Sequence, residues 1–127
     1  MNGTKIAFDT NVAIKLMERQ YDLSSLGINV DETKFLTSVI VRMELLSKRN
    51  MENDEELIIL RFLDGLTVIP LNEPIEQKAI EIRRATSLKL PDSIIAATSI
   101  ILDALLLTDD EHLLKLFWPG FRKQSIS

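Results

Sequence analysis

Cysteine is absent from this sequence of 127 residues, and His112 is its single histidine. Without cysteine, the chain can form neither a disulfide framework nor a thiolate zinc site. A lone imidazole also excludes a zinc site built from several histidines. Any metal ion that this protein binds must therefore be held mainly by oxygen ligands.

Long hydrophobic runs are also missing. The most apolar stretch, from Ile94 to Leu107, is interrupted by Asp103 and is shorter than the roughly 20 residues that span a bilayer. Residues 1–5 lack the apolar core of a secretory signal peptide. We therefore expect a soluble, cytoplasmic protein.

Positive charge is in the minority, with 15 lysines and arginines against 19 aspartates and glutamates and a formal net charge of -4. This balance disfavours nucleic-acid binding through a polybasic surface, although it allows a local basic patch. The length fits one domain of roughly 100–200 residues, and the sequence contains no repeat and no linker. We therefore predict a single domain over residues 1–127.

Short apolar runs alternate with stretches that have the length and spacing of helices. The predicted strands cover residues 5–8, 34–37, 66–71 and 104–108, with a further edge strand at 122–126. The predicted helices include 39–48, 91–103 and 109–117, and residues 21–32 are expected to form a loop. Such alternation is typical of a three-layer α/β/α domain with a mainly parallel central sheet.

Acidic residues follow the predicted strands. Asp9 comes directly after the first strand, and Asp109 and Asp110 come after the fourth. Asp92 starts the helix that runs antiparallel to the fourth strand, so it is expected at the same edge. Glu44 joins them if its side chain faces inward. Because ligands of parallel α/β sheets bind at the carboxyl ends of the strands, we expect these acids to converge.

Converging carboxylates repel one another and raise each other's pKa unless a cation neutralises them. An all-oxygen set suits Mg²⁺ or Mn²⁺, and such ions promote phosphodiester hydrolysis. Each acid alone has a simpler explanation, since helix caps and first-turn positions favour acids. Only the joint pattern favours a catalytic cluster.

Four segments resemble the motifs of the PIN-domain family, in the family's order. The first has a hydrophobic-Asp-Thr-Asn pattern, the second a Ser/Thr-led helix start followed by Glu-Leu, the third an Asp before Ile-Ala-Ala-Thr, and the fourth a strand that ends in Thr-x-Asp. These segments are Ile6–Asn11, Thr37–Leu45, Leu90–Thr98 and Leu107–Asp110. Each motif alone is weak, whereas four in register are quite specific.

The sequence is most similar to VapC-type toxins of toxin–antitoxin pairs. The resemblance implies an endoribonuclease that depends on Mg²⁺ (or Mn²⁺), is usually a homodimer and is held inactive by a VapB-like antitoxin. It also implies an acidic catalytic quartet of Asp9, Glu44, Asp92 and Asp110. Asp9 and Asp92 would be the most direct metal ligands, and the other two acids would position the attacking water or bind a second ion.

The same resemblance gives supporting roles to Thr10, Asn11 and Thr108, which would orient the carboxylates. The Thr-x-Asp spacing selects Asp110 as the fourth acid, but Asp109 is adjacent and could replace it.

Several other features have two interpretations at this stage. The basic pairs, such as Arg83-Arg84, are more typical of solvated surface than of an RNA contact, and His112 is expected at the surface. The apolar positions Val12, Leu16 and 57–63 exceed what a small core needs, which suits a dimer interface or an antitoxin groove as well as core.

Two other functions remain open. The first is a non-catalytic binding module of the same fold, although a decayed site would be expected to lose an acid. The second is an aspartyl-phosphate phosphotransfer domain, which fits poorly. Receiver domains need paired acids after the first strand, and haloacid-dehalogenase-like enzymes need Asp-x-Asp where this chain has Asn11.

Overall fold

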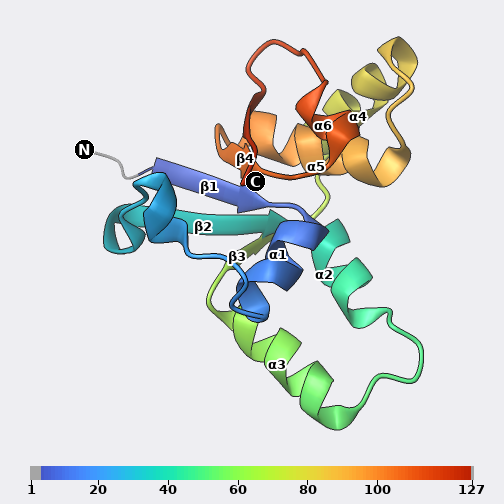
Figure 1. Cartoon of the computed structure of the whole chain (residues 1–127). Coiled ribbons are helices and arrows are strands. Elements are labelled where there is room, and N and C mark those ends of the chain that lie inside the picture. Colours follow the sequence, from blue (N-terminus) through green and yellow to red (C-terminus); the bar gives the residue numbers. More distant parts are fainter. Residues whose placement is uncertain (1–3, 127) are drawn as a thin grey trace.

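The computed structural model describes residues 4–126 (Figure 1). Its strands are β1 (Thr4–Phe8), β2 (Thr33–Ser38), β3 (Thr67–Ile69), β4 (Leu105–Leu107) and β5 (Arg122–Gln124). Its α-helices are α1 (Thr10–Met17), α2 (Val39–Leu46), α3 (Asn53–Asp64), α4 (Glu73–Ala85), α5 (Leu90–Ile101) and α6 (Glu111–Leu114).

All pairings in the five-stranded sheet are parallel, and the strand order is β3-β2-β1-β4-β5. The chain first builds outward from β1 to β3 and then returns to the other side of β1. The strand order therefore reverses between β1 and β4, where Phe8 lies opposite Leu107. Open α/β sheets bind ligands at this kind of switch point, beyond the carboxyl ends of the strands.

Helices cover both faces of the sheet, which confirms the predicted three-layer α/β/α arrangement. Figure 1 shows α4, α5 and α6 on one side of the sheet and α1 on the other. Because side chains alternate along a strand, Ala7 packs in the core that includes α4 and α5, whereas Ile6 and Phe8 pack with Val12 of α1 in a second core. Both faces of β1 are thus buried, as expected for a central parallel strand.

Several helix starts follow from local capping, because a short polar side chain satisfies free N–H groups of the first turn. Ser38 accepts a hydrogen bond from the N–H of Ile40, and Asn72 accepts one from Ile75. Serine and asparagine are among the residues preferred at the position before a helix, so both helix starts follow from local sequence.

Some boundaries differ from those predicted. The last helix was expected over 109–117 but contains only Glu111–Leu114, and the third strand is reduced from 66–71 to Thr67–Ile69. The predicted loop at 21–32 contains two short 3-10 turns, capped by Asp22 and Asn29. The strands expected at 104–108 and 122–126 and the helix expected at 39–48 are also shorter than predicted, so the sequence pattern overestimates the length of several elements.

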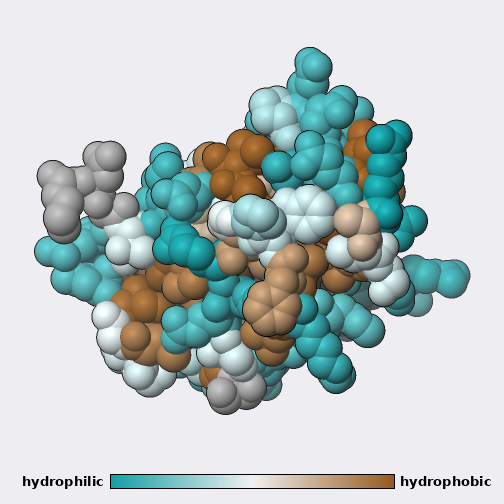
Figure 2. Space-filling model, turned by 90° about the horizontal axis from the view of Figure 1, so that it is seen from above, coloured by the Kyte–Doolittle hydropathy of each residue, from teal (hydrophilic) through white to brown (hydrophobic). Residues whose placement is uncertain are grey.

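On the face shown in Figure 2, apolar side chains reach the surface in separate patches between hydrophilic ones. In the part of the chain that the structure describes, every helix is too short or too polar to cross a membrane.

Candidate active site

Asp9 is the most buried of the candidate acids, with only 4% of its surface exposed. It caps α1, and its Oδ1 accepts a hydrogen bond of 2.9 Å from the N–H of Val12. Its Oδ2 accepts a hydrogen bond from the hydroxyl of Thr108, which follows β4. Asp9 is therefore held in one orientation by an N–H of α1 and by a hydroxyl just beyond the end of β4.

Glu44 reaches the same edge from α2. Its Oε1 accepts a hydrogen bond of 2.6 Å from the hydroxyl of Thr10 at the start of α1. The side chain therefore faces α1, although it stays exposed to solvent. Of the two orientations that helical spacing allowed, the structure has the one directed toward the other acids.

Asp110 and Asp92 complete the group from the other side. Asp110 caps α6, where its Oδ1 accepts hydrogen bonds from the N–H groups of His112 and Leu113. Its own N–H donates to the hydroxyl of Thr108 at 2.9 Å. Asp92 lies in the first turn of α5, as its predicted position near the end of β4 requires.

These side chains line one open cavity of about 190 Å³. Its walls are formed by Asp9, Thr10, Asn11, Glu44, Asp92, Ile95 and Asp110. Across residues 4–126, no lysine or arginine is among them. The structure thus brings all four predicted acids together with Thr10 and Asn11, and it places Thr108 directly behind Asp9.

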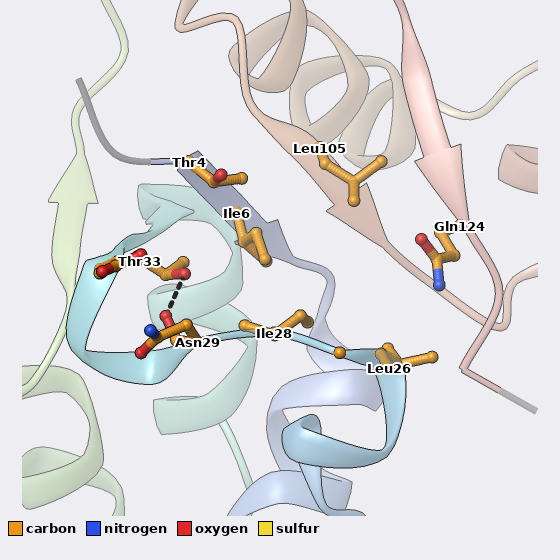
Figure 3. Close-up of a pocket in the computed structure, with 10 residues that line it drawn as sticks. Thr4, Ile6, Leu26, Ile28, Asn29, Thr33, Leu105 and Gln124 are labelled. Atoms are coloured by element: carbon orange, nitrogen blue, oxygen red, sulfur yellow. Dashed lines mark hydrogen bonds between the residues drawn. The ribbon is translucent and has the colours of Figure 1, made fainter. Parts of the chain in front are cut away.

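The acidic cavity is smaller than another hollow of the structure, so volume alone would indicate a different candidate site. A hollow of about 700 Å³ lies at the amino-terminal edge of the sheet, beside Thr4 and Thr33 (Figure 3). Apolar side chains such as Ile6 and Leu105 line it together with scattered polar groups, and Glu32 is its single acid among the described residues. The charge pattern therefore locates the candidate site, and the volume does not.

The acids are electrostatically strained against one another. Burial raises the pKa of Asp9, and the charges of Asp110 and Asp109 raise it further, although the hydrogen bonds from Thr108 and Val12 oppose the shift. Burial also raises the pKa of Asp92, with further contributions from Asp110, Glu44 and Asp9. A cation placed between these groups would relieve both effects.

The donor set fits a hydrated divalent ion. Within residues 4–126, no three acidic or imidazole side chains are arranged to hold an ion by themselves. Mg²⁺, however, commonly keeps several waters and takes only one or two carboxylates from the protein. Two buried or half-buried carboxylates with raised pKa values, Asp9 and Asp92, supply such a pair.

Asp109 is directed away from the cavity. Its Oδ2 pairs with Nζ of Lys15, and its Oδ1 accepts hydrogen bonds from Ser125 and from the N–H of Ile126. Burial alone would raise the pKa of Asp109, but the hydrogen bond and charge of Lys15 lower it below its ordinary value. The structure therefore places Asp110, and not Asp109, among the cavity acids.

A family model for the PIN domain matches residues 6–117 of this sequence. The chain belongs to the PIN-domain family. PIN domains are in general nucleases and typically depend on divalent metals. No curated protein sequence is significantly similar to the chain.

Solved structures share the PIN fold over almost the whole chain. VapBC2 from Rickettsia felis, bound to a promoter DNA fragment, is 19% identical over 96% of this chain and 98% of that one, with a TM-score of 0.81. DNA-bound VapBC from Salmonella typhimurium is 18% identical over 98% and 99%, also with a TM-score of 0.81. VapBC-1 from nontypeable Haemophilus influenzae is 18% identical over 96% and 98%, with a TM-score of 0.78. At these identities the likeness shows the fold.

Sequence reasoning missed one residue that lines the cavity of this PIN domain. Ile95 lines the cavity one helical turn after Asp92, and that spacing could have identified it. The charge of His112 lowers the pKa of Asp92, so this histidine lies within electrostatic reach of the acids, although it is at the surface as expected.

We predict that Asp92→Asn stabilises the metal-free protein at neutral pH. Because the pKa of Asp92 is raised by folding, its ionised form destabilises the fold above that pKa, and this penalty disappears below the unfolded value. Thermal melts in a chelator should show a higher melting temperature for the variant at pH 7.5 and a smaller difference, or none, at pH 3.5.

Asp54→Asn is the matched control, because Asp54 is an exposed acid in the first turn of α3, as Asp92 is an acid in the first turn of α5, and it does not line the cavity. A gain in stability at pH 7.5 that is equal in the two variants would contradict the prediction, since it would reflect net charge and not the cavity.

Proposed function

We propose that this PIN domain is the toxin of a VapBC-type pair, an endoribonuclease that depends on Mg²⁺ or Mn²⁺. One observation carries the proposal. Asp9, Glu44, Asp92 and Asp110 converge on one cavity, and none of the described residues that line this cavity is a lysine or an arginine. Structural likeness to toxin–antitoxin complexes supports the choice among PIN nucleases.

In this proposal Asp9 and Asp92 hold the divalent ion, and Glu44 and Asp110 bind the attacking water or a second ion. The ion would supply Lewis-acid activation of the phosphodiester and of water at neutral pH. The raised pKa values of Asp9 and Asp92 favour this assignment, because ion binding would relieve their unfavourable ionisation.

The chain's own residues fix the geometry for hydrolysis. Thr108 and the N–H of Val12 each hold one oxygen of Asp9, so the carboxylate cannot rotate freely. Thr10 orients Glu44 by its hydrogen bond, and the start of α6 holds Asp110. Because Glu44 is exposed, the RNA backbone has access to the cavity from its side.

We predict that purified chain free of antitoxin cleaves RNA with Mg²⁺ or Mn²⁺ and that a chelator abolishes the cleavage. Asp9→Asn and Asp92→Asn should reduce kcat/KM by more than about 100-fold, because each removes a direct ligand. Thr108→Val should cost about 10–100-fold, the usual effect of losing an outer-shell partner of a metal ligand. Initial rates on a labelled single-stranded RNA measure all three effects.

Folding must be checked in the same variants. Titration with Mg²⁺ or Mn²⁺ should raise the melting temperature of the wild type, because a ligand that binds only the folded state stabilises it, and should not do so for Asp92→Asn. Absence of cleavage and of metal stabilisation in the wild type would overturn the proposal in favour of a non-catalytic binding module.

A groove between α1, α2 and α3 suits the proposed antitoxin. It encloses about 460 Å³, and apolar side chains of all three helices line it, among them Ile14, Leu45 and Ile58. Thr10 and Glu44 line both this groove and the acidic cavity. We propose that a VapB-like partner lays an apolar helix face in the groove and directs a basic side chain toward Glu44.

The structure separates the apolar residues of α1 and α3 into buried core residues and exposed surface residues. Val12 is completely buried in the core, so it cannot form an interface. Leu57, Ile58 and Leu60 on α3 are between 43% and 55% exposed, which suits partner binding.

Phe117, beyond the groove, is 89% exposed, and we propose that exposed apolar side chains of this kind mediate a homodimer, which light scattering would detect.

We predict that Ile58→Asp weakens binding of a VapB-like antitoxin by more than tenfold, since it buries a charge at the centre of an apolar interface. RNA cleavage without the antitoxin should stay at the wild-type rate. Titration calorimetry gives the affinity, and inhibition of cleavage gives an independent value.

Leu71→Asp is the matched control, because Leu71 is 49% exposed and does not line the groove. Equal loss of affinity in both variants would place the antitoxin on another surface.

A further inference from the structure

Lys15 and Asp109 form an ion pair beside the acidic cavity, and the nuclease chemistry proposed above does not use either residue. Nζ of Lys15 pairs with Oδ2 of Asp109 across 94 positions of sequence. Lys15 lies in the last turn of α1, whose first turn is capped by Asp9. Asp109 precedes Asp110 directly. The pair therefore joins the two segments that carry Asp9 and Asp110.

Asp109 is also fixed to the C-terminal segment. Its Oδ1 accepts hydrogen bonds of 3.3 Å from Ser125 Oγ and 3.2 Å from the N–H of Ile126. Ile126 is 7% exposed and packs in the second core with Phe8 and Val12. With Lys15, three donors from two separate segments thus hold a single carboxylate that is 17% exposed.

Asp109 and Asp110 are neighbours on a segment that leaves the sheet just before them. The N–H of Thr108, just before these two residues, still bonds to the sheet, since it donates to the carbonyl of Gln124 at 3.1 Å. The carboxylate of Asp109 binds Lys15 and the C-terminal segment, whereas the side chain of Asp110 lines the acidic cavity. Because one peptide unit joins the two residues, anchoring Asp109 restricts the backbone from which the side chain of Asp110 extends.

We propose that Lys15 and Asp109 are positioning residues that set the placement of Asp110 relative to Asp9. This proposal deepens the nuclease function and rests on it for its kinetic effects. The two adjacent acids then have different roles. The carboxylate of Asp110 lines the acidic cavity, and the carboxylate of Asp109 anchors the backbone next to it. It also makes the segment around Ser125 and Ile126 part of the support of the site.

A positioning role differs from a role in stability alone. Lys15 is 38% exposed and Asp109 is 17% exposed, so water still reaches the ion pair and we expect its contribution to folding to be small. Misplacement of an acid, in contrast, typically lowers activity by about 10–100-fold, as does loss of other groups that orient metal ligands. Loss of kcat with a nearly unchanged melting temperature is therefore the expected signature.

The test compares Asp109→Asn, Lys15→Met and the double variant with the wild type. Both single variants should lower kcat about 10–100-fold and change KM for RNA little, and the double variant should be no worse than either, because the two residues act together. Lys15→Arg should recover most of the activity. Lys78→Met, which breaks the exposed Lys78–Glu81 pair on α4, is the matched control and should keep the wild-type kcat.

A second readout does not depend on catalysis. The N–H groups of His112 and Leu113 donate to Asp110, so their hydrogen exchange, followed by NMR, reports the placement of that carboxylate. Exchange of these two amides should accelerate about tenfold or more in Asp109→Asn, whereas the amides of α4 should keep their wild-type rates.

Wild-type kcat and wild-type exchange in Asp109→Asn would overturn the proposal. Faster exchange spread equally over α4 and α6 would also overturn it, since the pair would then act only through global stability. If the wild type cleaves no RNA but the exchange at His112 and Leu113 still responds to Asp109→Asn, the nuclease proposal fails and the positioning role stands.

Discussion

The parallel pairing of β1 with β4 is the constraint on which the candidate site depends. Phe8 lies opposite Leu107, so the next residues, Asp9 and Thr108, leave the sheet at the same level. Thr108 can then donate its hydroxyl to Asp9 and accept from the N–H of Asp110. One buried hydroxyl thereby connects two of the four acids, and burial of both faces of β1 fixes the register that makes this contact possible.

The arrangement concentrates negative charge at a cost that the helix termini partly offset. Asp9 and Asp110 cap α1 and α6, where free N–H groups and the helix dipole favour a carboxylate. Asp92 lies in the first turn of α5 and has the same dipole advantage. These local contacts stabilise the acids singly, but burial, and to a smaller extent mutual repulsion, still raises the pKa values of Asp9 and Asp92. This residual cost of ionisation is what a divalent cation, as proposed above, would relieve.

Thr10 and Glu44 connect the acidic cavity to the apolar groove of α1, α2 and α3. A partner seated in the groove would therefore contact one of the four acids without entering the rest of the cavity. The hydrogen bond between Thr10 and Glu44 lies at this junction. Its position supports a link between partner binding and access to the proposed catalytic acids, since both surfaces share the same two side chains.

The sequence by itself determined the features that depend on neighbours along the chain. The α/β alternation, the caps at Ser38 and Asn72, and the placement of acids after β1 and β4 all follow from local pattern, because strand ends and helix starts are defined within a few residues. Local pattern placed Asp9, Asp92 and the pair Asp109-Asp110 at one edge of the sheet, whereas the full quartet and the preference for Asp110 came from the resemblance to PIN domains.

Only the tertiary structure decided the features that depend on distant residues. The short extent of α6, the orientation of Glu44 toward Thr10, and the exposure of Ile58 in contrast to the complete burial of Val12 follow from packing between elements. The separation of Asp109 from its neighbour Asp110 is the clearest case. Its partner Lys15 lies 94 positions away, and no local pattern can indicate which of two adjacent carboxylates a distant ammonium group will meet.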